Sequence, residues 1–64
     1  MKMTNKQKEI VNQAIERYKG FGWDSEIVYA THAWIRHQVR KQCAAYNLHE
    51  ITRYADEQIA RRAA

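Results

Sequence analysis

Sixty-four residues, 45% of them hydrophobic and 28% charged, have the composition of one folded domain and exclude a disordered chain or several domains. Two glycines, no proline and a single cysteine exclude a glycine-rich phosphate loop and an internal disulfide, and favour helices. Eleven Lys and Arg against seven Asp and Glu give a net charge of +4, which favours an anionic partner. The chain lacks a membrane-spanning apolar run and a signal-peptide core, so we expect a cytoplasmic protein.

The first predicted helix covers residues 5–19. Thr4 and Gln7 have the spacing of a capping box, in which each side chain accepts a hydrogen bond from the backbone N–H of the other residue. Lys19 in the last turn and Gly20 directly after it are typical of a helix C-terminus. The predicted inner face consists of Met3, Gln7, Ile10, Val11, Ala14, Ile15 and Tyr18.

The second predicted helix is the longest and covers residues 25–46, with Asp24 as its N-cap. Its apolar arc is broad enough to pack against two neighbours, and Gln38 and Gln42 within that arc indicate an interface. Because this helix is longer than its neighbours, we expect it to overhang them and to mediate homodimerisation. Its two apolar lines are Val28, Ile35, Val39 and Tyr46, and Ile27, Trp34 and Ala45.

The third predicted helix covers residues 48–62. Asn47 ends the second helix and caps the third, with Glu50 at the capping-box position. The inner stripe of this helix is Leu48, Ile51, Ala55 and Ile59. Three capped amphipathic helices with short connections predict an all-α three-helix bundle that forms a single domain over residues 1–64.

The residues that could carry chemistry do not converge. His32 and His37 are five positions apart, so on a helix their side chains diverge by about 140°. Cys43 and His49 have no third residue to complete a nucleophile pair, and no glycine-rich oxyanion loop accompanies them. We therefore expect no metal, no cofactor, no catalytic residues and no enzymatic activity.

One face of the second helix combines bases with an aromatic residue. Tyr29, Ala33, Arg36 and Arg40 lie in one row, and no acid interrupts this face from Tyr29 to Tyr46. Arg and Trp are the residues most enriched at binding hot spots, which adds Trp34 to the candidates. The predicted partner-binding residues are Tyr29, Trp34, Arg36, His37, Arg40 and Lys41.

Two functions fit this face, and a solvated surface without a partner gives the same pattern. The first is a small helical regulator, inhibitor or adaptor, of the kind that phages and mobile elements encode, which docks on the acidic surface of a protein partner. The second is a nucleic-acid-binding protein that contacts phosphates through the second helix. The basic row lacks Asn or Gln to read bases, so protein binding ranks first.

Residues 43–54 resemble a helix-turn-helix motif, which would imply DNA binding. Ala45 precedes the turn and Asn47 stands in the place of the motif's glycine. The predicted turn is too short, however, because Asn47 both ends one helix and begins the next. The predicted recognition helix also carries Glu50, Asp56 and Glu57, which phosphates would repel.

Overall fold

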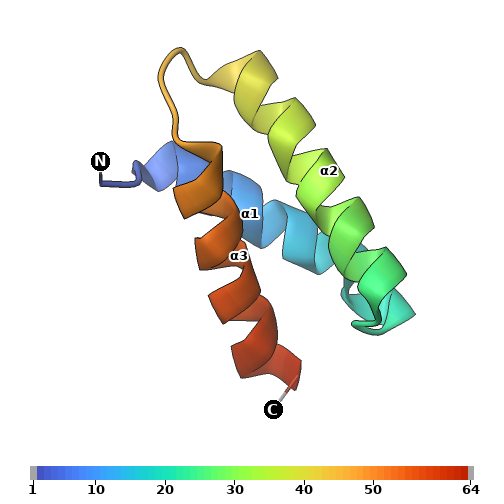
Figure 1. The fold of residues 1–64 in the computed structure, drawn as a ribbon. Helices are drawn as coiled ribbons and strands as arrows, with labels where there is room; N and C mark the ends of the chain where they lie inside the picture. The colour runs from blue at the N-terminus through green and yellow to red at the C-terminus, as the bar shows by residue number, and fades with distance from the viewer. Residues whose placement is uncertain (1, 64) are drawn as a thin grey trace.

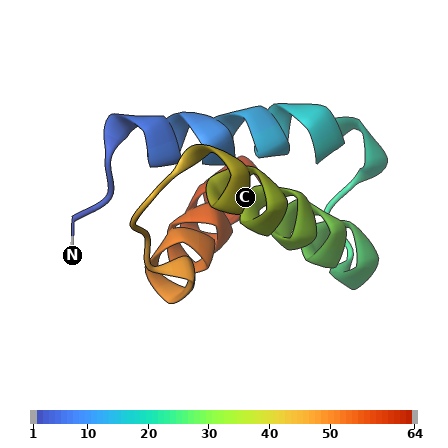
Figure 2. The same cartoon turned by 90° about the horizontal axis from the view of Figure 1, so that it is seen from above.

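The computed structural model describes residues 2–63, and these form three helices, as predicted (Figure 1). Helix α1 covers Asn5–Tyr18, α2 covers Ser25–Gln42 and α3 covers Leu48–Ala63, with a short 3₁₀ helix, η1, at Lys19–Phe21. Figures 1 and 2 together show two layers, in which α1 crosses one side of the pair formed by α2 and α3. The outer side of α2 therefore faces away from both neighbours.

The capping box at the start of α1 is confirmed. The Gln7 backbone N–H donates to Thr4 Oγ1 at 3.1 Å, and the Thr4 N–H donates to Gln7 Oε1 at 3.2 Å. The same glutamine is buried, and its Nε2 donates to the carbonyl oxygen of Ala45 at 3.2 Å. One side chain thus caps α1 and fixes the loop between α2 and α3.

The end of α1 differs from the prediction. The helix ends at Tyr18, and Lys19 keeps a right-handed backbone (φ −59°, ψ −28°) as the chain tightens into η1. Gly20 is therefore not a left-handed C-terminal cap. The residue with positive φ is Gly22, at φ 85° and ψ 171°, where the chain turns into α2. The turn needs the second glycine rather than the first.

The end of α2 is the larger correction. The predicted Asp24 cap is confirmed, because its carboxylate accepts the Ile27 N–H at 3.0 Å. The helix nevertheless ends at Gln42, not at residue 46, because Cys43 has an extended backbone (φ −123°, ψ 135°). Residues 43–47 form a loop, and Ala45 is exposed rather than part of the inner face.

Two consequences follow from the shorter α2. With 18 residues against 16 in α3, α2 has no long overhang, so the predicted reason for homodimerisation is lost. The five-residue loop also removes the objection that a helix-turn-helix would need a longer turn. The acidic residues of α3 remain as the objection to DNA binding.

The hydrophobic core consists of side chains from all three helices. Thr31, which the apolar pattern missed, is also fully buried, and its hydroxyl donates to the Ile27 carbonyl at 2.7 Å. Asn47 Oδ1 accepts the Glu50 N–H at 3.1 Å and so caps α3 as predicted. The buried hydrophobic residues are Ile10, Val11, Ala14, Ile15, Ile35, Val39, Ile51, Ala55 and Ile59.

Candidate binding surface

The orientation of α2 is set by the residues that it buries, Thr31, Ile35 and Val39. The opposite side of the helix, which we call the α2 face, then points into solvent. We define the α2 face as Tyr29, Ala33, Arg36, His37, Arg40 and Lys41, with Trp34 at its edge.

Tyr29 is the exposed aromatic of this face, with 68% of its surface accessible. Arg36 stands two turns further along α2, and its Cζ lies 5.9 Å from the centre of the Tyr29 ring. A guanidinium over an aromatic ring is attracted to it electrostatically, by about 0.5–1 kcal/mol at an exposed site. The face therefore presents an apolar ring and a positive charge side by side.

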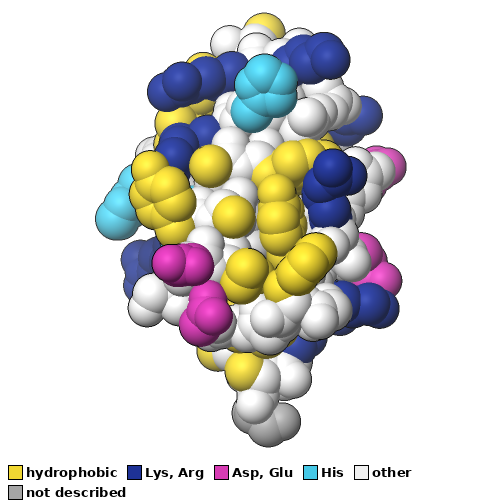
Figure 3. Space-filling view, turned by 90° about the vertical axis from the view of Figure 1, so that its right-hand side faces the viewer, with side chains coloured by type: hydrophobic (Ala, Val, Ile, Leu, Met, Phe, Trp, Pro, Cys, Tyr) yellow, Lys and Arg dark blue, Asp and Glu magenta, His cyan; other side chains and the backbone are white. Residues whose placement is uncertain are grey.

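The remaining basic residues of the α2 face are His37, Arg40 and Lys41. All three are exposed, and within residues 2–63 their side chains form no ion pair or hydrogen bond. Figure 3 looks onto this side of the molecule: hydrophobic side chains gather in the middle, Lys, Arg and His lie at the upper end and on both sides, and Asp and Glu lie at the lower left and along the right edge. The three bases are thus available to an acidic ligand.

Trp34 lies at the edge of the α2 face rather than in its centre. It is half-buried and packs against the hydrophobic core. Arg17 of α1 places its Cζ 5.9 Å from the Trp34 ring centre, so this ring joins α1 to α2. Most of its surface serves the fold, and its exposed edge borders the face.

His32 has a partner that the sequence pattern did not indicate. Its Nε2 lies 2.6 Å from Asp56 Oδ1 on α3, in a pair whose side chains are 21% and 55% exposed. The contact directs the His32 ring toward α3. Residues 24 positions apart on different helices share no local spacing signal, so only the tertiary fold could place them together.

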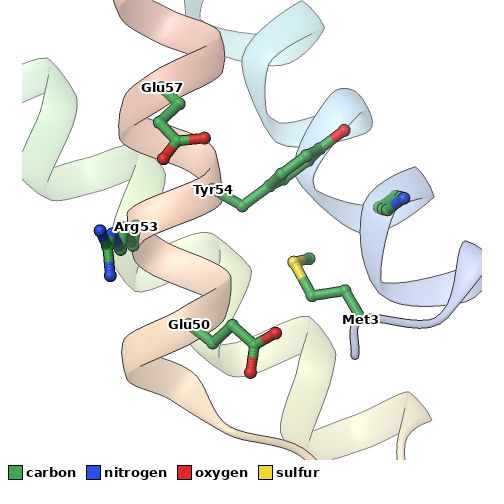
Figure 4. Close-up of a pocket in the computed structure, with 6 residues that line it drawn as sticks. Met3, Glu50, Arg53, Tyr54 and Glu57 are labelled. Carbon is green, nitrogen blue, oxygen red and sulfur yellow. The ribbon is translucent and has the colours of Figure 1, made fainter. Parts of the chain in front are cut away.

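A second surface feature is a depression of about 340 Å³ between the start of α1 and α3 (Figure 4). Tyr54 extends from α3 toward α1 and Met3, and Lys8 Nζ lies 6.0 Å from its ring centre. The lining mixes two bases with two acids, so it offers no single charge to a ligand. Its residues are Met3, Lys8, Glu50, Arg53, Tyr54 and Glu57.

The described part of the chain contains no group of three or more His, Cys, Asp or Glu side chains placed to hold a metal ion. Cys43 is a free, half-buried thiol. Within residues 2–63, none of the helices has the length and apolar character needed to cross a bilayer. No protein-family model, curated protein or solved structure matches this chain.

Proposed function

We propose that the protein is a cytoplasmic, non-enzymatic binding protein, a regulator, inhibitor or adaptor, that docks on the acidic surface of a protein partner through the α2 face. The observation that carries this proposal is the Tyr29–Arg36 pair, an exposed aromatic ring with a guanidinium 5.9 Å from its centre. Aromatic and Arg side chains are the residues that most often dominate binding energy at protein interfaces.

The surroundings of this pair support a protein partner. Ala33, between them on α2, is small and half-exposed, so it does not block the close approach of another surface. Arg40 and Lys41 add charge toward the end of α2, where an acidic rim would face them. An apolar centre with charges at one end suits a folded protein surface better than a uniformly charged phosphate backbone.

Nucleic acid is the second candidate, and the observation that favours it is the unpaired state of His37, Arg40 and Lys41. Phosphate contacts from these residues would give binding that weakens steeply with salt and reads little sequence. Asp56 and Glu57 on the neighbouring helix α3 are exposed and weigh against it.

The test is a paired capture experiment with nuclease-treated lysate. The immobilised proteins are the wild type, the double variant Arg36→Glu/Arg40→Glu and the control Arg53→Glu/Arg61→Glu. The control changes the net charge equally but places the change on exposed residues of α3. We expect the wild type and the control to retain a protein that the α2 variant does not.

The affinity of that protein, once purified, should fall at least tenfold for the α2 variant and less than threefold for the control. Equal retention by all three proteins would refute the proposal. A parallel capture from lysate without nuclease completes the test, because retention that occurs there and disappears after nuclease treatment would favour the second candidate.

A further inference from the structure

The outer side of α2 carries a regular seam of side chains. Glu26, Ala30, Ala33, His37 and Arg40 follow one another at spacings of four, three, four and three residues. This alternation places them on one line along an α-helix and is the spacing at which two helices pack side by side. Ala30 and Ala33, the middle members, are small and half-exposed, so a second helix can approach closely there.

The charges along this seam are opposite at its two ends. Glu26 lies in the first turn of α2, preceded by Asp24, whereas Arg40 and Lys41 lie in the last turn. In Figure 3, acidic side chains lie at the lower left of this side and Lys, Arg and His side chains at its upper end, while both kinds also line the right edge. The arrangement also suits the dipole of α2 itself, because acids stabilise a helix N-terminus and bases its C-terminus.

A seam that is acidic at one end, small in the middle and basic at the other is complementary to itself when two copies run antiparallel. With a two-fold axis between Ala30 and Ala33, Ala30 of one copy lies over Ala33 of the other. Glu26 then lies beside His37 and Arg40 of the second copy, and the symmetry repeats this pairing at the other end. Parallel pairing would instead bring like charges together.

We infer that in the free protein the outer side of α2, which includes Ala33, His37 and Arg40 of the α2 face, is covered by a second copy of this chain packed antiparallel across Ala30 and Ala33. An interface one helix face wide, about 27 Å long, buries on the order of 1,000 Å² in total, which is at the low end for specific complexes. The dimer is therefore weak and reversible. If the proposed function holds, on which this step rests, the acidic partner and the second copy compete for the same face.

The first test is the oligomeric state, measured by sedimentation equilibrium over a series of protein concentrations. The wild type is expected to dimerise reversibly. Glu26→Arg and Arg40→Glu should each weaken the dimer at least tenfold, because each brings like charges together. The double variant Glu26→Arg/Arg40→Glu exchanges the charges and should return to within about threefold of the wild type. A monomer at all concentrations, or a double variant weaker than both single variants, would overturn the inference.

The second test fixes the register. Two single-cysteine proteins, Ala30→Cys and Ala33→Cys, both in a Cys43→Ser background, are mixed and mildly oxidised. The mixed disulfide is expected to form faster than either homodimer. It should also form faster than the disulfide of Ala60→Cys, an exposed control position on α3. Equal rates at positions 30, 33 and 60 would contradict the antiparallel packing.

The disulfide-linked dimer then tests competition in the capture experiment described above. It should retain none of the proteins that the same material retains after reduction. Equal retention before and after reduction would overturn the competition. If the wild type captures no protein at all, the proposed function fails, whereas the sedimentation and cross-linking results still decide whether the second copy covers α2.

Discussion

His32 Nε2 lies 2.6 Å from Asp56 Oδ1 and joins α2 to α3, the two helices that α1 crosses. The pair consists of one partly exposed imidazole and one mostly exposed carboxylate, so water screens part of their attraction. It directs His32 toward α3, so His32 is not one of the residues of the α2 face.

Removing the carboxylate of this pair should have a small effect on stability. Asp56→Asn is expected to lower the free energy of unfolding by up to about 1 kcal/mol, because a hydrogen bond or ion pair at this exposure contributes no more than this. Urea denaturation measures it, and a double-mutant cycle with His32→Gln isolates the pairwise interaction. A coupling energy of zero would mean that the contact does not stabilise the packing of α2 on α3.

Gln7 should contribute more to the free energy of unfolding than Thr4, the other residue of the capping box. Thr4→Ala removes one cap and should cost about 1 kcal/mol. Gln7→Ala also removes the hydrogen bond to the Ala45 carbonyl and leaves space at a buried position, so about 2–3 kcal/mol is expected. Urea denaturation of both variants compares them, and equal losses would mean that the contact with Ala45 adds no stability.

The two glycines of the first connection should respond oppositely to alanine. Nothing lies within 4 Å of a methyl group added at either position, so the backbone conformation decides the outcome. Gly22→Ala forces a side chain onto φ 85° and ψ 171° and should cost about 1–3 kcal/mol. Gly20→Ala should stabilise by about 0.4–1 kcal/mol through the unfolded chain. Thermal unfolding that ranks the two variants the other way would contradict the described turn.

Glu16 provides a prediction about pH. The hydrogen bond and charge of Lys19, 2.9 Å away, lower the pKa of Glu16 below its ordinary value of 4.5, and the charge of Arg62 adds to this. A carboxylate with a lowered pKa in the folded state stabilises the protein above its unfolded pKa. That contribution is lost as the pH falls through the folded pKa.

An NMR titration of the Glu16 side chain checks this assignment. Its midpoint should lie below 4.5 in the wild type and should move upward in Lys19→Gln. Arg61→Gln, a neighbouring base that forms no ion pair within residues 2–63, serves as the control and should leave the midpoint in place. An unchanged midpoint in Lys19→Gln would show that the lysine does not pair with Glu16 in solution.

The start of each helix could be predicted from the sequence because its signals are local. Thr4, Asp24 and Asn47 each accept a backbone hydrogen bond from the residue three positions later, and that spacing is visible in the sequence. The end of α2 could not be predicted in this way. Ala44 and Ala45 favour a helix, but the Ala45 carbonyl accepts a hydrogen bond from Gln7, a residue 38 positions away.

The candidate site also combines residues that local spacing predicts with contacts that only the packing of the helices creates. The row of Tyr29, Arg36 and Arg40 follows from helical spacing alone, and in the structure Tyr29 and Arg40 are exposed and Arg36 is half-exposed. The two relations that shape its edges, Trp34 under Arg17 and His32 beside Asp56, depend on how the helices pack. Thr31 was missed because it is polar, although its hydroxyl is satisfied within its own helix and can be buried.

Mapping backbone amide shifts by NMR shows whether the α2 face is the binding surface. The isotope-labelled protein is titrated with the purified partner from the capture experiment. We expect the largest shifts at Tyr29, Ala33, Arg36, His37, Arg40 and Lys41. Shifts confined to the depression between α1 and α3, at Met3, Lys8, Arg53 and Tyr54, would contradict it and place the binding surface on the other side of the molecule.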